Sequence, residues 1–490
     1  MKNTLLLLLF LAICAPAWAQ VQLGDDIEGE GIWDETGYAI TLSADGTRLA
    51  VSATRLGGGD LSLAGKVRIF QLTNNQWQPL GAAIEGSVPN LLLGFAVAFS
   101  ADGNRLAVGL PGYDGPQSNE GGVQVYEWSG TVWEALGDLI PGELSGDEAG
   151  RAVALSADGY RVAIGSRGND ENGALAGQVR VFEYKDGFWI QLGGNINGPG
   201  MFASFGQSVA LSADGTRLAV GSSFINGYQG QLQVFDFQGA TWTPVGDPIE
   251  GESGSGLGHS IAISADGDYL LAGAPETTTH GAHSGAARVF HIQNGQWQQL
   301  GETLLGDGEE DRFGWSVDIT ANGQRIACGA NQDQEGAPSM SGYVRVFDWN
   351  GDAWVPAIAD LIGENPGDQY GCAVSLSSVG TTLAIGGIKN DGVDYNAGHT
   401  QAFALAPVAV APSVTTSPLQ LFPNPTSGAV QLSGLTGASW PIRIYDSEGR
   451  LVATRQLTEP ALELSQLPAG AYTLRIQMEG RWQTLPFHKY

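Results

Sequence analysis

The sequence predicts an all-β chain: a seven-bladed β-propeller of four-stranded antiparallel blades, closed by an N-terminal strand and followed by a small β-sandwich domain. The first observation is a repeat of the turn SADG or a close variant, at steps of 52 to 57 residues. Its seven copies end at Gly46, Gly103, Gly159, Gly215, Gly267, Gly323 and Gly380. A fixed period of this length is typical of propellers and solenoids.

The second observation is that each copy contains four β-like runs. In the fourth copy, Ser208–Ser212 alternates small and branched residues, and Asp214-Gly215 then supplies a tight hairpin turn. Arg217–Gly221 returns as a second strand, Gln231–Phe237 alternates again, and TWTPVGDPIEG forms the fourth run. The first two runs carry few charges on either face, so both faces must be covered by neighbouring copies. Stacked blades satisfy that requirement.

The third observation concerns the two ends of the repeat, residues 20–406. The seventh copy stops at its third run, HTQAFAL, while the chain near its start reads VQLGDDIEG, which matches the end of the fourth run WQPLGAAIEG. We therefore expect Val21–Gly29 to pair with the strand containing Thr400–Leu405 and to close a ring without an open edge.

Residues 1–19 have the pattern of a secretory signal peptide. Lys2 precedes the apolar run Leu5–Ala15, and Ala17-Trp18-Ala19 places small residues where a signal peptidase reads them. A lipoprotein signal at Cys14 is the weaker alternative, because Ile13 stands where a small residue is needed. No later stretch is apolar enough to span a membrane.

The charge of the chain is uneven. The formal charge is −28, and setting aside Lys2 and the near-neutral last 78 residues leaves about −30 on the repeats. Such a body repels nucleic acid and anionic membranes, although an excess of negative charge that serves only solubility is the alternative interpretation.

Cys328 and Cys372 are the cysteines beyond the signal, and the sequence does not decide whether they pair. Cys328 occupies a slot that holds Val or Ile elsewhere, which predicts a core position.

The phrases FGQSVALSADGTRLAVGS and FGWSVDITANGQRIACGA resemble the FG-GAP repeat, the blade of integrin α-chain propellers and of many bacterial surface proteins. That resemblance implies a propeller, and in the family the hairpin between the first two strands often binds calcium. Here the hairpin is a bare four-residue turn with one Asp. We therefore expect no cofactor; a divalent cation stays an open alternative that these turns do not indicate.

The tail, residues 419–490, follows a Pro/Ala/Thr linker at 407–418. Its segments LFPNPTSG, IRIYDSEGRLV and LSQLPAGAYTLRI together resemble the type A C-terminal sorting domain of the type IX secretion system of Bacteroidetes. The matching motif residues are Pro423, Asn424, Pro425, Gly428, Tyr445, Gly449, Leu467, Gly470 and Tyr472. The resemblance implies a β-sandwich, export through the Sec pathway and then type IX secretion, and the type IX machinery as a partner. Pro486 is expected to interrupt the last strand.

Catalytic signals are sparse. The chain has no GxSxG elbow, HExxH, P-loop or CxxC motif. His280 and His283 have a spacing that permits metal binding, but surface histidines are the simpler interpretation, and His259 stands in a strand slot that favours packing. One tryptophan recurs in the fourth run of six copies, which favours packing between blades over a row of sugar-binding rings.

Acidic residues gather in the loops that differ most between copies. Candidate residues of a binding rim are Asp34, Asp114, Asp170, Asp311, Asp333 and Asp391. A solvated rim is the alternative interpretation. The sequence thus favours a secreted or surface-attached, non-catalytic binding module whose protein or glycan ligand, basic or bridged by a cation, contacts these loops. Two alternatives stay open: a polysaccharide- or peptide-degrading enzyme with a site in the channel, and a structural surface-layer component.

Overall fold

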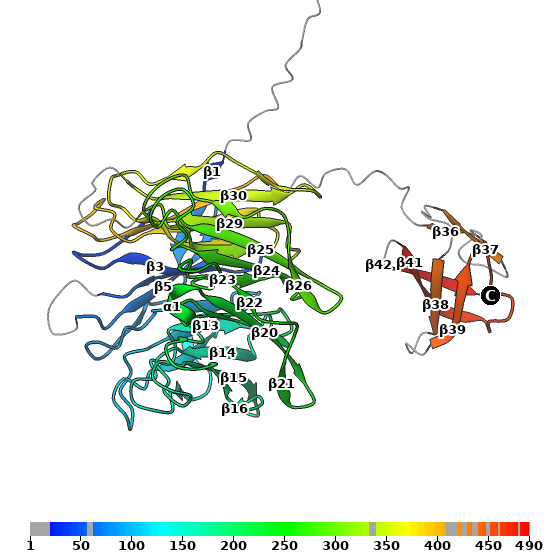
Figure 1. Cartoon of the computed structure of the whole chain (residues 1–490), viewed down its shortest axis with the longest axis horizontal. Helices are drawn as coiled ribbons and strands as arrows, with labels where there is room; N and C mark the ends of the chain where they lie inside the picture. Colours follow the sequence, from blue (N-terminus) through cyan, green and yellow to red (C-terminus); the bar gives the residue numbers. More distant parts are fainter. Residues whose placement is uncertain are drawn as a thin grey trace, which may run out of the picture. The chain divides into compact units, whose positions relative to one another are not determined.

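The computed structural model describes residues 20–55, 62–332 and 340–407, and in the tail 420–422, 429–433, 440–446, 451–458, 461–478 and 481–489. The chain divides into two compact units, Met1–Ala409 and Val410–Tyr490. Regular structure in the described residues is almost entirely β, with one short helix, α1 (Ile225–Tyr228). The first unit is built from antiparallel sheets, as expected for a β-propeller (Figure 1).

The sheets of the first unit follow the repeat. The first sheet has β3 (Thr36–Leu42), β4 (Arg48–Ala53), β5 (Lys66–Thr73), β6 (Gln76–Pro79) and β7 (Ile84–Glu85). The second has β8 (Val97–Phe99), β9 (Arg105–Gly109), β10 (Gly122–Trp128), β11 (Trp133–Ala135) and β12 (Ile140–Pro141). The third has β13 (Ala152–Leu155), β14 (Arg161–Ser166), β15 (Gln178–Lys185), β16 (Phe188–Gln191) and β17 (Ile196–Asn197).

The next sheets repeat this order. The fourth has β18 (Ser208–Leu211), β19 (Arg217–Ser222), β20 (Gln231–Gln238), β21 (Thr241–Pro244) and β22 (Ile249–Glu250). The fifth has β23 (Ile261–Ile263), β24 (Tyr269–Ala274), β25 (Ala286–Gln293), β26 (Gln296–Gln299) and β27 (Leu304–Leu305). The sixth has β28 (Phe313–Ile319), β29 (Arg325–Ala330), β30 (Tyr343–Trp349), β31 (Trp354–Pro356) and β32 (Leu361–Ile362). The seventh has β33 (Tyr370–Leu376), β34 (Thr382–Gly387) and β35 (His399–Ala404), joined by β1 (Val21–Gln22) and β2 (Ile27–Glu28).

The predicted fourth run of each repeat is split into two short strands. In the first sheet, β6 and β7 both pair with β5, one at each end. Between them Gly81 takes a positive φ of 83°, and a Cβ there would meet the Trp128 ring at 2.7 Å. A side chain is excluded at this point, so the strand breaks at the Leu-Gly step.

The predicted closure by the N-terminal segment is present. Val21 pairs with Ala404 and Ile27 with Thr400, both antiparallel. The amides of Leu23 and Gly29 donate to the carbonyls of Ala402 and Gly398 at 2.7 and 2.8 Å. The last sheet therefore contains strands from the two ends of the repeat region.

The turns between the first two strands of each sheet are linked by backbone hydrogen bonds. The residue after the serine or threonine of each turn donates its amide to the carbonyl of its counterpart in the next sheet, at 2.8 to 3.0 Å. The donors in order are Ala44, Ala101, Ala157, Ala213, Ala265, Ala321 and Ser378, and Ser378 donates back to Ala44. Each turn spans five residues rather than four, as in Ser43–Thr47, and the Asp45 carboxylate accepts from Ser43 and from the Thr47 amide.

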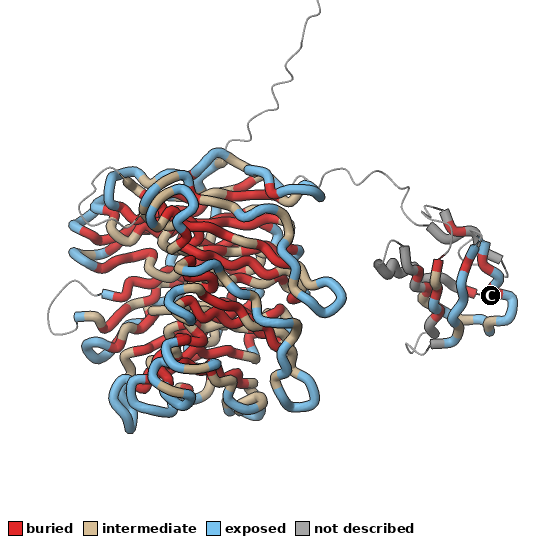
Figure 2. Tube along the Cα trace, viewed as in Figure 1, coloured by how far each residue is buried: buried red, intermediate tan, exposed pale blue. Residues whose placement is uncertain are grey.

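The second strand of each sheet is buried on both faces. The second residue of this strand follows an arginine in most sheets and is a fully buried Leu, Val or Ile in every sheet: Leu49, Leu106, Val162, Leu218, Leu270, Ile326 and Leu383. Burying each such side chain contributes about 1.5–3 kcal/mol. Figure 2 shows the buried residues concentrated in the strands and the exposed ones in the loops, which is the pattern expected of sheets packed face to face. Cys328 lies fully buried in this core, as predicted, and burial raises the pKa of its thiol.

The recurring tryptophans pack between sheets. The indole Nε1 of Trp189 donates to the carbonyl of Leu136 in the preceding sheet at 2.8 Å. Trp133, Trp242, Trp297 and Trp354 make the same bond at 2.8 to 3.2 Å. The packing interpretation is confirmed for these five.

The second unit contains two sheets. Its strands are β36 (Gln420–Phe422), β37 (Ala429–Ser433), β38 (Trp440–Asp446), β39 (Leu451–Leu457), β40 (Ala461–Glu463), β41 (Gly470–Met478) and β42 (Arg481–Lys489). They pair in the orders β36-β37-β40 and β39-β38-β41-β42 around a core that includes Ile442, Leu474 and Ile476. The expected interruption at Pro486 is wrong: β42 runs through it, opposite Thr473. An edge strand tolerates proline because one side of it forms no ladder bonds.

Candidate functional site

The candidate site is a cavity of about 460 Å³ where the first strands of the sheets meet. In each repeat a glycine stands at the start of the first strand, as in the FG of FGQSVAL. Each repeat contributes to the lining the residue that directly follows this glycine, and we call this position the slot. These residues are Tyr38, Phe95, Arg151, Gln207, His259, Trp315 and Cys372. Seven equivalent slots thus carry seven different side chains. The lining is completed by Arg167, Phe224, Asn331, Gln369 and Ile388, which lie at the starts or ends of the variable loops.

The backbone before each slot brings these side chains inward. Gly150, which precedes Arg151, has φ of 91°, and a Cβ there would lie 2.3 Å from the carbonyl oxygen of Gly122. Three residues before each slot, φ is also positive, including six non-glycine residues: Glu35, Leu92, Glu148, Ser204, Arg312 and Gln369. A left-handed residue costs about 1 kcal/mol in an L-amino acid. Because it recurs in every repeat, this turn is a property of the scaffold.

Aromatic rings and guanidinium groups contact one another around the cavity. Tyr38 and Phe95 have ring centroids 5.0 Å apart, and Arg151 lies over the Phe95 ring at 4.4 Å. On the other side, the centroids of His259 and Trp315 are 4.4 Å apart. These contacts restrict the positions of large side chains that line the cavity.

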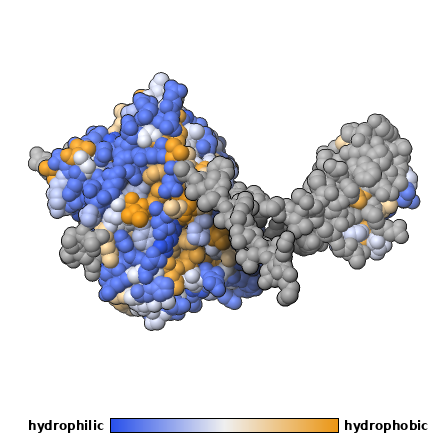
Figure 3. All heavy atoms as spheres, turned by 90° about the horizontal axis from the view of Figure 1, so that it is seen from above, coloured by the Kyte–Doolittle hydropathy of each residue, from blue (hydrophilic) through white to orange (hydrophobic). Residues whose placement is uncertain are grey.

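The charge of the lining is positive. Arg151 and Arg167 share one carboxylate, Glu148 Oε2, at 3.1 and 3.2 Å, and Arg167 also donates to Gln207 Oε1 at 3.2 Å. Among the described residues that line the cavity there is no Asp or Glu. The cavity is therefore cationic within a strongly acidic body, whose surface in Figure 3 is mostly hydrophilic with apolar side chains in narrow patches.

The titratable groups of the lining are neutral at pH 7 apart from the arginines. Burial, together with the charges of Arg312 and Arg167, lowers the pKa of His259 to about 4. Burial raises the pKa of Tyr38 and of the Cys372 thiol to about 12 each. Cys372 and Cys328 are both free thiols. The site thus offers neutral donors, aromatic faces and two guanidinium groups, and its thiol is not a thiolate.

The candidate rim aspartates lie elsewhere. Asp34 and Asp311 are buried, at 6% and 4% exposure, where they accept backbone amides of their own loops. Asp311 also accepts from the hydroxyl of Tyr343 at 3.0 Å. Both were candidate residues of an exposed binding rim, and in the structure they hold the loops that lead into the first strands. Their burial follows from the folding of these loops over them.

The other rim aspartates share a loop geometry. Asp114, Asp170 and Asp391 are exposed, and Oδ1 of each accepts the amide of the fifth residue on, at 2.6 to 2.7 Å. Each therefore closes a loop between the second and third strands. Asp333 lies outside the described residues. None of the described rim aspartates lines the cavity.

The two histidines with metal-binding spacing do not converge. His280 Nδ1 lies 2.7 Å from the Gly306 carbonyl oxygen, and His283 contacts Glu276. In the described residues three potential metal ligands do lie together at a place that sequence reasoning missed, namely Asp26, Glu28 and His399.

In the tail, Leu467 packs against the core and Tyr472 is buried, with its hydroxyl donating to the Pro468 carbonyl at 3.0 Å. Gly470 begins β41 and Tyr445 lies in β38. Pro423, Asn424, Pro425, Gly428 and Gly449 are outside the described residues.

Sequence reasoning also missed the cavity. The signal was present: the slot after the FG-like glycine varies completely within a repeat whose neighbouring positions are nearly uniform. In a symmetric scaffold, variation confined to one slot indicates that each copy does something different there.

Comparison with known proteins identifies the tail. Residues 420–485 match the family described as the secretion system C-terminal sorting domain. No protein of curated function matches the chain. Among solved structures, it is similar to a "putative 6-phosphogluconolactonase" from Bacteroides uniformis, with TM-score 0.47 and 14% identity over 67% of this chain and 86% of that one. A second protein of the same description, from Bacteroides fragilis, has TM-score 0.45 and 15% identity over 69% and 86%.

Those structural likenesses are too distant to bear on activity, whereas the tail match bears directly on location. No helix in the described residues is long and apolar enough to cross a membrane. The sorting domain at residues 420–485 indicates that the protein is exported by type IX secretion, to the cell surface or into the medium.

Proposed function

We propose that this exported protein is a non-catalytic binding module: a seven-bladed, FG-GAP-like β-propeller that holds its ligand in the central cavity, with a signal peptide before it and a sandwich-like sorting domain after it. The closed cycle of seven turn-to-turn hydrogen bonds supports the seven-bladed ring. The two sheets of the tail support a sandwich. The signal peptide and the FG-GAP likeness rest on the sequence patterns.

The observation that carries the binding proposal is the set of seven different side chains at one repeated slot. A cavity of about 460 Å³ is within the usual range for small-ligand sites. Aromatic faces beside guanidinium groups, with no carboxylate in the described lining, suit a ligand that combines flat apolar faces with negative charge. An acidic sugar at the end of a glycan has this chemistry.

The variable loops surround the mouth of the cavity, because Arg167, Phe224 and Ile388 stand where the loops after the second strands begin. A ligand larger than the cavity would reach these loops and their aspartates. The negative rim and the positive cavity favour opposite ligand charges, so the two parts of the proposal can be tested separately.

The test is binding of uronic-acid oligosaccharides and of their neutral counterparts, measured by calorimetry. We expect the acidic sugars to bind and Arg167→Gln to weaken binding about tenfold or more, because a hydrogen bond to a charged group is lost. Trp315→Ala should weaken binding of both sugar classes. Arg55→Gln is the matched control, since Arg55 follows an equivalent strand but does not line the cavity.

The rim is tested by neutralising Asp170 and Asp391 to Asn, which keeps a side-chain oxygen to accept the loop amide. If these variants abolish binding while Arg167→Gln and Trp315→Ala bind normally, the ligand sits on the loops and the cavity proposal is wrong.

The same samples test the two alternative functions, a hydrolase and a structural surface-layer component. A hydrolase would release products from the bound sugars, and we expect none, because the described residues of the lining include no ionised nucleophile and no carboxylate pair. A surface-layer component would self-associate, which sedimentation detects.

A further inference from the structure

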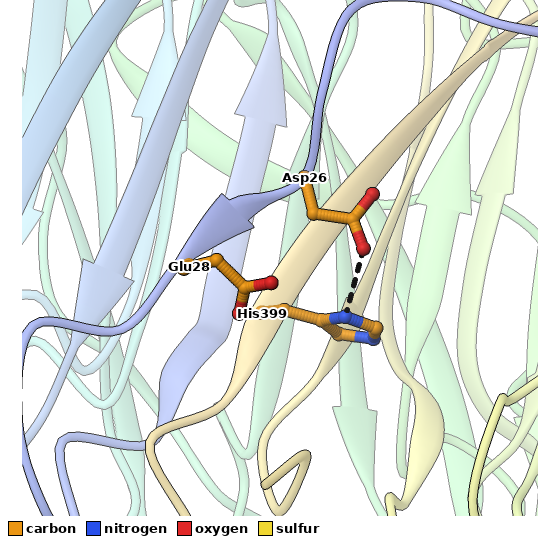
Figure 4. A group of neighbouring side chains, drawn as sticks. All are labelled: Asp26, Glu28 and His399. Atoms are coloured by element: carbon orange, nitrogen blue, oxygen red, sulfur yellow. Dashed lines mark ion pairs between the residues drawn. The ribbon is translucent and has the colours of Figure 1, made fainter. Parts of the chain in front are cut away.

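We propose that Asp26, Glu28 and His399 bind one divalent transition-metal ion, of the zinc class, that fastens the N-terminal strand to the seventh sheet. This goes beyond the proposed ligand binding and does not depend on it. Figure 4 shows the three side chains turned toward one another, from the segment around β2 and from β35.

The strand register brings these residues together. Glu28 stands directly opposite His399 in the antiparallel pair of β2 and β35. Asp26 lies two residues before Glu28, so its side chain falls on the same side of the segment. Ile27, between them, points the other way and is buried in the core at 5% exposure. The three donor atoms lie within 4.8 Å of one another.

The histidine is buried and makes no side-chain hydrogen bond. The His399 side chain is 0% exposed, and neither ring nitrogen makes a hydrogen bond. Its Nδ1 lies 3.4 Å from Asp26 Oδ2, and Glu28 Oε2 is likewise buried without a hydrogen bond. Buried polar atoms without hydrogen bonds are rare and destabilising, and an ion between these side chains would satisfy one ring nitrogen of His399 and Glu28 Oε2 together.

Other sheets fill the same register pair differently. Lys66 binds Glu85 at 2.9 Å in the first sheet, and Gln231 donates to Glu250 at 2.6 Å in the fourth. Gln178 donates to Asn197 at 3.1 Å in the third. In those sheets the two side chains contact each other directly through a hydrogen bond or an ion pair. In the seventh sheet the equivalent pair is instead His399 and Glu28, and the Asp26 carboxylate lies beside them.

The surroundings orient the ligands. Gln401 Nε2 donates to Asp26 Oδ2 at 3.0 Å and to Glu364 Oε1 at 3.1 Å, while its Oε1 accepts the hydroxyl of Tyr370 at 2.9 Å. Hydrogen-bonded carboxylate ligands of this kind are usual behind metal sites. Arg68 Nη2 donates to the Glu28 backbone carbonyl at 2.6 Å and leaves the carboxylate available.

The donor set indicates the class of metal. One imidazole and two carboxylates suit Zn²⁺, whereas Ca²⁺ takes six to eight oxygen ligands. Tetrahedral donors about 2.0 Å from zinc lie roughly 3.3 Å apart, so no pair of donors needs to close by more than about 1.5 Å, and His399 Nδ1 and Asp26 Oδ2 are already 3.4 Å apart. Water would supply the fourth ligand.

The experiment titrates the purified, metal-stripped chain with Zn²⁺ and Co²⁺. We expect one Co²⁺ per chain with the visible absorption of a tetrahedral site, displaced by Zn²⁺. At a hundredfold excess of Zn²⁺ over Kd, the melting temperature should rise by about 3 °C and EDTA should reverse the rise. Ca²⁺ should give neither effect.

His399→Ala should abolish the Co²⁺ spectrum and the Zn²⁺-dependent shift. Glu28→Gln and Asp26→Asn keep the side-chain volume and replace His399→Ala in the test if that variant does not fold. Each should weaken or abolish the Co²⁺ spectrum. His291→Ala, a histidine outside the cluster, is the matched control and should behave as wild type. Absence of a cobalt spectrum from the wild-type chain, or an unchanged spectrum in Glu28→Gln and Asp26→Asn, would overturn the proposal. So would a Ca²⁺ response equal to that of Zn²⁺.

Discussion

Arg325 offers the sharpest test of how neighbouring sheets are fastened. Its Nε and Nη2 donate to the two oxygens of Asp348 at 2.6 and 2.8 Å. Its Nη1 donates to the carbonyls of Gly380, in the next sheet, and of Ala406, both at 2.6 Å. The side chains of Arg325 and Asp348 are only 3% and 12% exposed. Arg325→Ala would leave a nearly buried carboxylate without its partner.

Removing one partner of a buried ion pair costs about 3–5 kcal/mol, because the remaining charge is desolvated and uncompensated. The same slot of the second sheet provides the comparison. Arg105 contacts Glu127, whose side chain is 40% exposed, and donates to the Asp158 carbonyl at 2.8 Å. Arg105 Nη2 also donates to the hydroxyl of Tyr160 at 2.8 Å. Arg105→Ala should cost only about 1–2 kcal/mol, from a partly exposed ion pair and two exposed hydrogen bonds.

Urea denaturation of both variants measures these differences. We expect Arg325→Ala to lower the free energy of unfolding by at least about 2 kcal/mol more than Arg105→Ala. The double variant Arg325→Ala/Asp348→Ala should be less destabilised than the sum of its single changes, because it removes the orphaned charge. If the two single variants lose the same free energy of unfolding, burial does not set the contribution of the Arg325–Asp348 ion pair to stability, and the reasoning is refuted.

Three further predictions concern the closure, the pH dependence and the tail. A chain beginning at residue 32 loses the pairing with β35 and the burial of Ile27, so we expect it to be less stable by about 3–5 kcal/mol, and a melting temperature equal to that of the full chain would contradict the closure. Burial raises the pKa of Asp318 from 3.8 to about 6. The folded state therefore holds that proton more tightly than the unfolded state, and stability should fall as pH rises from about 4 to 6. Asp318→Asn should flatten this slope in denaturation curves taken across that range. Truncation after residue 412 should leave the melting of the first unit unchanged and abolish surface display in a host with type IX secretion; normal display would refute the role of the tail.

Much of the architecture was accessible to sequence reasoning because it rests on local, repeated chemistry. The turns, the buried second strand and the inter-sheet tryptophans recur in register, so each copy supports the interpretation of the others. The pairing of Val21 with Ala404 was also predictable, since a run missing from one end of the repeat appeared at the other.

Two features went against local expectation. The fourth run divides into two strands because a backbone glycine packs against a ring of the neighbouring sheet, a contact that no single repeat contains. Asp34 and Asp311 resemble solvated loop residues in sequence, but the loops fold over them and use their carboxylates as acceptors.

The sequence by itself determined the repeat, the closing strand and the sorting tail, because each is carried by residues close together in the chain or by a period that can be counted. Only the tertiary structure decided which side chains meet. Tyr38 and Trp315 share a cavity, and Asp26 comes to His399, across hundreds of residues. The physical reason is that closing the sheets into one cyclic arrangement sets these distances, and neither the period nor the composition of a repeat carries that information.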